Sequence, residues 1–173
     1  MPLRGEYLGM PIAISDLDAE NQAFYRYCGA HDLHLQRCGL CDLLRYPPTT
    51  ACPFCSSPEA VWMPVEGRGT VYSYGEMHHA IQPAFRAFAP YLLLLLVELD
   101  TQRGVPGEFD GLRMTANLAT PEGELAPPEL VRQVGIGTRV RIVYRDVGEG
   151  LAMPLFAIDE TVEQPAPWRY PLE

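Results

Sequence analysis

Two closely spaced cysteine pairs constrain the fold of this chain more than any other feature. Cys38 and Cys41 form one C-x2-C pair, Cys52 and Cys55 form a second, and ten residues separate the pairs. Each C-x2-C turn directs two sulfurs towards one point, and two such turns on a short hairpin complete the tetrahedral four-sulfur shell that zinc accepts. The spacing therefore predicts a structural zinc ion, which has no open coordination position and performs no chemistry.

Other uses of the cysteines remain open at this point. Disulfides are disfavoured in a reducing compartment, and a thioredoxin-like redox pair needs a βαβ setting and a single C-x2-C motif. Iron in a rubredoxin-like site fits the same four sulfurs. The fifth cysteine, Cys28, has no lysine nearby to lower the pKa of its thiol, so we expect a packing residue rather than a reactive group.

Length and composition predict a globular chain in the cytoplasm. The 173 residues suit one domain with a small appendage, and the 47% apolar content argues against disorder. The longest apolar run, residues 91–97, is far shorter than the roughly 20 residues that cross a bilayer. The first residues lack the pattern of a signal peptide, so a cytoplasmic location is the default expectation.

The charge argues against a nucleic-acid partner. The chain has 13 basic residues, all arginine, against 22 acidic ones, and its net charge is −9. Neither half is basic, since residues 1–66 carry −4 and residues 67–173 carry −5. A zinc ion with four thiolates would lower the balance to about −11. Proteins that bind nucleic-acid backbones normally present a basic face, whereas two or three local arginines can still hold a small anionic ligand.

Hydrophobic patterning predicts a mainly β protein. Residues 1–14 are expected to form a surface arm, followed by a helix that ends at Cys28 before Gly29. A strand over 33–37 enters the first cysteine pair. Later segments predict a helix over 128–134 and five strands, of which 91–99 is continuously apolar and therefore expected to be buried on both faces. The expected strands are 70–74, 91–99, 112–118, 138–144 and 151–157, the last an edge strand because of Pro154.

Five strands with one helix between the third and fourth are typical of an OB-fold. The predicted fold class is thus an N-terminal helix plus a rubredoxin-like zinc ribbon, followed by a five-stranded OB-fold barrel. The expected boundaries are an arm and helix over 1–33, the ribbon over 34–64, the barrel over 65–160 and a Pro-rich tail over 161–173. Because it contains Trp168, the tail is interpreted either as a docking arm or as a strap on its own barrel.

This combination resembles the zinc-ribbon/OB-fold proteins of the acyl-CoA-associated DUF35 family. The resemblance covers roughly residues 16–160, and the matching segments are 35–41, 46–55, 67–73, 97–100 and 137–140. Asp42 and Ser56 stand where the family often has glycine, and the 101–111 connection is longer than the usual hairpin. The resemblance implies a small non-catalytic subunit of a thiolase-like enzyme, or sometimes of an acyl-CoA hydratase or retro-aldolase. The partner then supplies the catalytic group, and the small subunit helps to organise the acyl-CoA site.

Five residues are candidates for contact with coenzyme A. Arg37, Arg45 and Arg68 are expected near the ribbon and the barrel entrance, where the family implies contact with the 3′-phospho-ADP group. Tyr46 and the two prolines after it form a flat apolar ledge for a partner or an adenine ring. His78 is a lesser candidate for a phosphate contact. Adjacent strand residues point to opposite faces, so we expect one of His78 and His79 to be solvated and the other to be packed.

The sequence lacks the G-x-S-x-G, P-loop and H-E-x-x-H motifs of independent enzymes. A stand-alone acyl-CoA enzyme that uses Cys28 or a histidine is therefore a minor hypothesis. A single-stranded nucleic-acid-binding protein is the other alternative, since ribbons and OB-folds both serve that role. The favoured hypothesis is a zinc-containing accessory subunit that forms a hetero-oligomer with a thiolase-like protein.

Overall fold

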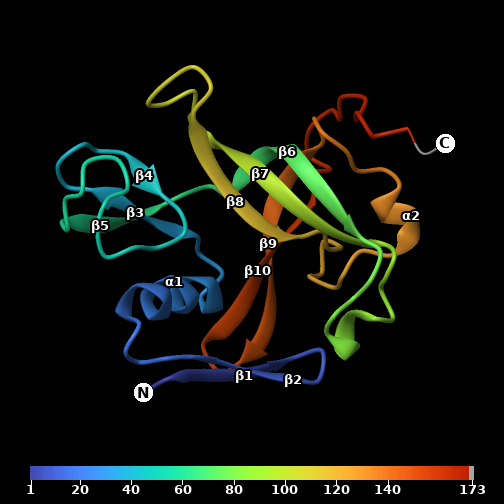
Figure 1. Cartoon of the computed structure of the whole chain (residues 1–173), viewed down its shortest axis with the longest axis horizontal. Coiled ribbons are helices and arrows are strands. Elements are labelled where there is room, and N and C mark those ends of the chain that lie inside the picture. The colour runs from blue at the N-terminus through green and yellow to red at the C-terminus, as the bar shows by residue number, and fades with distance from the viewer. Residues whose placement is uncertain (172–173) are drawn as a thin grey trace.

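The structure is a computed structural model that describes residues 1–171 (Figure 1). It contains a two-stranded hairpin, a three-stranded sheet in the order β4-β3-β5 and a five-stranded sheet in the order β10-β9-β6-β7-β8. The elements are β1 (Leu3–Tyr7), β2 (Met10–Ile14), α1 (Ala19–Gly29), β3 (His34–Cys38), β4 (Leu44–Arg45), β5 (Ala60–Pro64), β6 (Arg68–Met77), the 3₁₀ helix η1 (Pro83–Phe85), β7 (Leu92–Arg103), β8 (Gly111–Asn117), α2 (Pro128–Val131), β9 (Arg139–Gly148) and β10 (Leu151–Ile158). Neither α-helix in residues 1–171 is long and apolar enough to cross a bilayer.

The five-stranded sheet curls until its two outer strands meet. Leu118, directly after β8, bridges to Phe156 of β10, and the N–H of Ala119 donates to the Phe156 carbonyl at 2.8 Å. Leu95 and Leu99 of β7 are fully buried inside the resulting barrel. With α2 placed between β8 and β9, the near-closed barrel confirms the predicted OB-like fold class. The outer position of β10 agrees with the interpretation of its proline as an edge residue.

Helix α1 connects the hairpin to the ribbon and packs against the barrel (Figure 1). Asp18 caps the helix by accepting a backbone N–H at 3.1 Å. The buried face includes Phe24 and Cys28. A Cβ on Gly29 would collide with the carbonyl of Gly150 in the β9–β10 turn, so glycine lets the helix end touch the barrel backbone. The predicted helix is therefore confirmed.

One buried side chain joins the ribbon to the barrel. The amide of Gln102, at the end of β7, accepts the N–H of Leu44 at 2.8 Å and donates to the carbonyl of the same residue at 3.0 Å. Gln102 is 9% exposed, so these bonds form away from water. The side chain thus pairs with β4 as a neighbouring strand would, and it fixes the ribbon on the barrel.

Within the arm predicted over residues 1–14, β1 and β2 form a hairpin. β1 and β2 pair antiparallel, with Leu3 opposite Ile14 and Tyr7 opposite Met10. Gly5 crosses the β9–β10 hairpin so closely that a Cβ there would collide with a backbone carbonyl. This long-range contact places the hairpin, and a local pattern does not reveal it.

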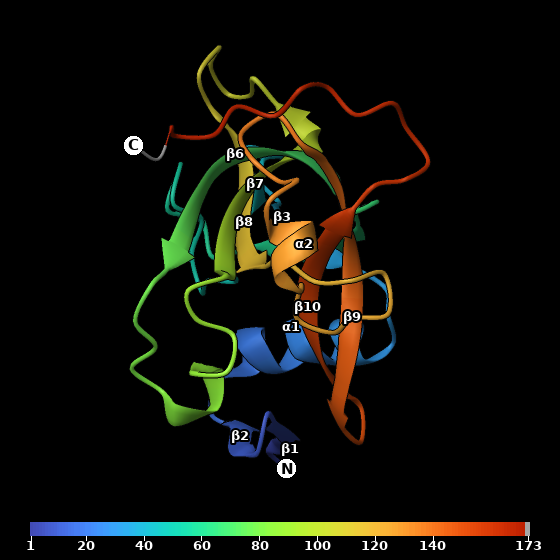
Figure 2. The ribbon, with the colours of Figure 1, turned by 90° about the vertical axis from the view of Figure 1, so that its right-hand side faces the viewer.

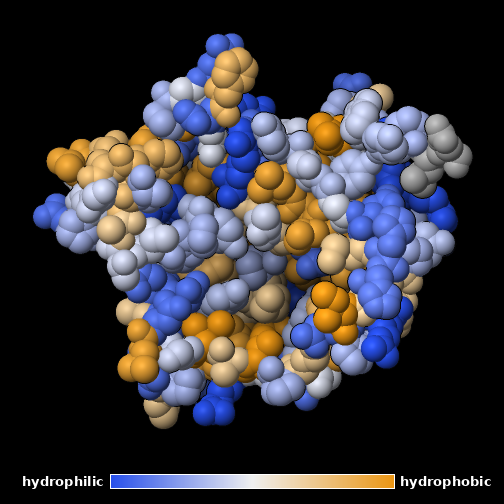
Figure 3. All heavy atoms as spheres, viewed as in Figure 1, coloured by the Kyte–Doolittle hydropathy of each residue, from blue (hydrophilic) through white to orange (hydrophobic). Residues whose placement is uncertain are grey.

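The prediction that β7 is buried on both faces is wrong. Its residues alternate, and Leu94 on the outer face is 41% exposed whereas Leu93 and Leu95 are buried. Figure 3 shows an orange area where β7 crosses the middle of the view. The inner face therefore forms the core, and nothing in residues 1–171 fully covers the outer face.

Two further segments are less regular than expected. The segment between the cysteine pairs contains only the two-residue strand β4, and the helix expected over 128–134 is a single turn that ends at Val131. The tail, which crosses one end of the barrel in Figure 2, behaves as a strap. Trp168 pairs with Ile136, and Arg169 donates to the carbonyl of Val131 at 2.7 Å. The last two residues of the expected tail, 172–173, lie outside the described residues.

Replacing the amide that joins ribbon and barrel should destabilise the whole chain. Gln102→Ala leaves a buried N–H and a buried carbonyl unpaired, so the free energy of unfolding should fall by about 2–4 kcal/mol. Urea denaturation measures this change. Gln133→Ala, at an exposed position with one hydrogen bond inside its own helical turn, is the matched control and should cost less than about 0.5 kcal/mol. Equal stability of the two variants would contradict the role given to Gln102.

Candidate metal centre

The first cysteine pair lies in a tight turn at the end of β3. The N–H of Cys38 donates to the carbonyl of Leu43 at 3.0 Å, and the N–H of Asp42 donates to the carbonyl of Cys38 at 3.2 Å. Asp42 has a φ of 65°, in the left-handed region. That region favours glycine, and aspartate and asparagine tolerate it better than most residues.

The second pair repeats this geometry. The N–H of Cys52 donates to the carbonyl of Ser57, and the N–H of Ser56 donates to the carbonyl of Cys52, both at 2.8 Å. Ser56 has a φ of 62°. The two positions at which the sequence departs from the glycine of DUF35 proteins are therefore the two left-handed positions, and both turns keep their shape without glycine.

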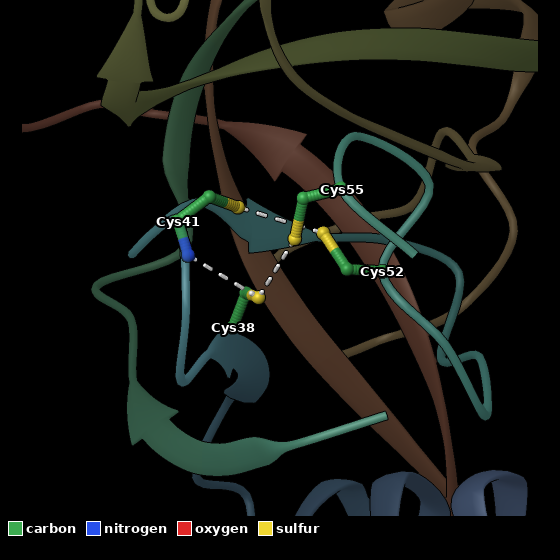
Figure 4. Close-up of side chains that lie close together, drawn as sticks. All are labelled: Cys38, Cys41, Cys52 and Cys55. Atoms are coloured by element: carbon green, nitrogen blue, oxygen red, sulfur yellow. Dashed lines mark hydrogen bonds between the residues drawn. The ribbon is translucent and has the colours of Figure 1, made fainter. Parts of the chain in front are cut away.

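The two turns bring all four sulfurs together (Figure 4). The Sγ atoms of Cys38 and Cys55 lie 3.5 Å apart, those of Cys41 and Cys52 lie 3.6 Å apart, and all four lie within 4.8 Å of one another. A disulfide needs about 2.05 Å, whereas the sulfurs of a zinc tetrahedron lie about 3.8 Å apart. The four cysteines are thus placed to bind one metal ion.

Backbone N–H groups favour the metal-binding thiolate form at Cys38 and Cys52, whereas burial and neighbouring cysteine side chains raise the pKa values of Cys41 and Cys55. The N–H groups of Cys41 and Leu40 lie 3.5 and 3.4 Å from Sγ of Cys38 and lower the pKa of that thiol to about 6. Burial raises the pKa of Cys52, but N–H donors from Phe54 and Cys55 outweigh it, so the net shift is downward. Four sulfur ligands leave no position for water, and such a site is structural rather than catalytic.

Cys28 is separate from this cluster. Its side chain is fully buried between α1 and the barrel, and burial raises the pKa of its thiol to about 12. A protonated, enclosed thiol is a poor nucleophile. The interpretation of Cys28 as a packing residue is therefore favoured over a reactive role.

The ribbon arginines have different environments. Arg37 is 41% exposed on the side chain and lies 3.3 Å from a carboxylate oxygen of Asp42. Arg45 is only 3% exposed, and it donates to the Gln36 amide at 3.0 Å and to the Thr49 carbonyl at 2.9 Å. Arg45 is thus buried inside the ribbon, where its backbone pairs opposite Gln36. Its contact with coenzyme A stays a prediction, which this burial does not favour.

The remaining candidates are spread along the barrel. Tyr46 is half-buried against Phe24, and burial raises the pKa of its hydroxyl to about 12. Arg68 begins β6 and pairs with the buried carboxylate of Asp159 at 2.9 Å. His78 and His79 are both exposed just beyond the other end of β6, so the expectation that one of them is packed is wrong. Arg68 and His78 lie at opposite ends of the ten-residue strand β6, which spans at most about 30 Å, so the candidates do not form one cluster.

The structure contains a cluster of charged side chains that the sequence analysis did not predict. On the outer face of β7, Glu98 lies 3.2 Å from both Arg103 and Arg113, and Asp100 pairs with Arg103 and Arg139. The guanidinium of Arg113 lies over the ring of Tyr72 at 3.9 Å. The alternation of acidic and apolar residues over 97–100 is the signal that predicts an outward-facing charged row.

Comparisons with known proteins place this geometry in a family. The model described as "ChsH2, C-terminal OB-fold domain" matches residues 62–145. A chain of the Ltp2-ChsH2(DUF35) aldolase structure is 30% identical, and the superposition covers 83% of this chain and 98% of that chain with a TM-score of 0.61. A DUF35 protein of unknown function from Sulfolobus solfataricus is 11% identical over 81% of this chain and 85% of that chain, with a TM-score of 0.49.

A curated relative is considerably longer than this chain. The probable enoyl-CoA hydratase alpha subunit of Thermomonospora curvata is 31% identical over 140 residues, which are 81% of this chain but only 38% of the relative. The chain therefore spans less than two fifths of the length of that protein. The aldolase chain, in contrast, is matched over almost its whole length at 30% identity. The chain belongs to the DUF35 family, with the OB-fold of ChsH2.

Proposed function

We propose that this chain is an accessory subunit of a thiolase-like acyl-CoA enzyme and that it helps to form the acyl-CoA site. The observation that carries the proposal is the match over 98% of the DUF35 chain of an aldolase whose name joins two components, Ltp2 and ChsH2. The hydratase name of the longer relative supports acyl-CoA chemistry in the same family. The catalytic group is assigned to the partner subunit, and the whole complex is assigned to the cytoplasm.

The proposal gives each part of the chain a role. Residues 1–33 brace the ribbon, 34–64 hold the metal, 65–160 form the barrel, and 161–173 strap it. The ion is proposed to be zinc, held by the four ribbon cysteines, because four thiolates with N–H donors suit a closed structural site. The ion supplies no chemistry to the reaction and fixes the shape of the ribbon.

Removal of one ligand should abolish metal binding. Wild-type protein purified without added metal should carry about one zinc ion per chain, and Cys55→Ser should lose most of it and unfold in the ribbon. Elemental analysis by mass spectrometry, with amide exchange of residues 34–64, measures both effects. Cys28→Ala is the matched control, since it removes a buried sulfur outside the cluster and should keep the metal. Full metal content in Cys55→Ser, or the visible absorbance of iron in the wild type, would overturn the zinc assignment.

Association should be visible in the native host. Affinity purification of the tagged chain should recover a thiolase-fold protein in comparable amount, identified by peptide mass spectrometry. The purified complex should turn over acyl-CoA substrates, and the isolated chain should not. Recovery of the chain alone, or turnover by the isolated chain, would contradict the proposed function.

Contacts with coenzyme A are proposed at Arg37, Tyr46, Arg68 and His78, with Arg45 retained as the least favoured. Arg37 offers the sharpest test, because its guanidinium is exposed and pairs with the exposed carboxylate of Asp42. In the complex, Arg37→Ala should weaken acyl-CoA binding about tenfold, measured by titration calorimetry. Asp42→Asn removes the competing charge and suits the left-handed backbone, so affinity should stay equal or rise. Unchanged affinity in Arg37→Ala would reject this contact.

A further inference from the structure

The outer face of the sheet formed by β6, β7 and β8 carries apolar side chains on β7 that are not fully buried. Alternate residues of β7 point inward and are buried, whereas Leu94 and Leu96 point outward. Leu94 is 41% exposed and Leu96 is half-buried. A strand that is apolar on both sides is the pattern of a strand with both faces covered. Residues 1–171 bury Leu92 at the start of β7 but leave Leu94 exposed and Leu96 only partly covered.

The cross-strand neighbours of Leu94 and Leu96 are small or polar and do not cover the two leucines. Across the ladder, Leu94 lies between Gly75 and Asn117, and Leu96 lies between Ser73 and Thr115. With the exception of Asn117, these positions line an open hollow of about 240 Å³ on the outer face. A Cβ added to Gly75 would meet nothing within 4 Å, so the hollow is free on that side. We call this surface, made of Ser73, Gly75, Leu94, Leu96 and Thr115, the leucine face.

A second exposed apolar group lies in the loop beyond Glu98 and Asp100. The loop between β7 and β8 exposes 84% of Phe109 and 44% of Val105. The loop is held in shape, because the N–H of Gly104 donates to the Asp110 carbonyl at 2.9 Å and Arg113 donates to the Phe109 carbonyl at 2.9 Å. An exposed aromatic on an ordered loop is the kind of group that anchors protein interfaces.

The charged residues near this loop indicate which kind of partner could bind there. Glu98 and Asp100, between the leucine face and the loop, are neutralised by arginines. Glu108 and Asp110, on either side of Phe109, are exposed and form no salt bridge with any residue in 1–171. The loop end of the surface is thus negative. A second copy of this chain, with a net charge of −9, would bring like charges together there.

We propose that the leucine face and Phe109 together form the docking surface for the partner subunit of the proposed complex. The partner would present an apolar ridge to the hollow and basic side chains beside Phe109. This inference rests on the proposed function and adds to it the place of contact and the chemistry of the partner. It accounts for the outward-facing Leu94 and Leu96, which residues 1–171 do not fully cover.

Two opposite substitutions test the surface without disturbing the fold. Leu94→Glu places a charge in the hollow, and Gly75→Val fills the hollow with apolar atoms. Both change exposed positions, so the thermal stability of the isolated chain should stay close to that of the wild type. Each should weaken binding to the purified thiolase-fold partner at least about tenfold, measured by biolayer interferometry. Leu17→Glu, the same substitution at a leucine that is 95% exposed outside the surface, should leave affinity within about twofold.

The outcomes separate this inference from the function on which it rests. If the wild-type chain recovers no thiolase-fold partner, the proposed function fails and this inference with it. If the wild type binds the partner and Leu94→Glu and Gly75→Val bind equally well, the docking surface is overturned and the function stands. If the isolated wild-type chain is a dimer that Leu94→Glu dissociates, as seen by sedimentation, the occupant is a second copy and the assignment to the partner is overturned.

Discussion

The ribbon depends on four cysteine sulfurs that lie close enough together to bind one metal ion. Its sheet is small, and β4 contributes only two residues. Four cysteine sulfurs within 4.8 Å would repel one another as thiolates, and a divalent ion removes that repulsion. The two left-handed turn residues cost about 1 kcal/mol each, whereas metal binding in small ribbons contributes about 10–16 kcal/mol. In the proposed zinc-bound form, the cluster therefore stabilises the shape of the ribbon.

The ribbon contacts the barrel through a shared apolar cluster, to which it contributes Leu35 and Leu44, and through buried polar contacts. Gln102 pairs with both backbone groups of Leu44, and Arg45 and Gln36 hold the inner side of the ribbon. On the barrel, Leu94 of β7 remains exposed on the outer face. The fifth cysteine stays buried and protonated. These features suit a subunit whose contribution is a rigid surface rather than a reactive group.

Local patterns predicted the four-cysteine cluster and most strands, because C-x2-C spacing and alternation act over a few residues. Long-range contacts escaped prediction. The hairpin over 3–14 is placed by the crossing at Gly5, Arg45 is buried by its pairing opposite Gln36, and the open side of Leu94 depends on which elements cover the sheet. A continuous apolar run shows that a strand can be buried on both faces, but it does not show whether the same chain supplies both covers.

Native mass spectrometry of the endogenous complex tests the central claim most directly, because one spectrum reports both the ion and the partner. The account predicts a hetero-oligomer in which this chain retains a single bound ion of the mass of zinc and remains attached to a thiolase-fold subunit. A spectrum that contains only the free chain, or a folded chain at its metal-free mass, would contradict it.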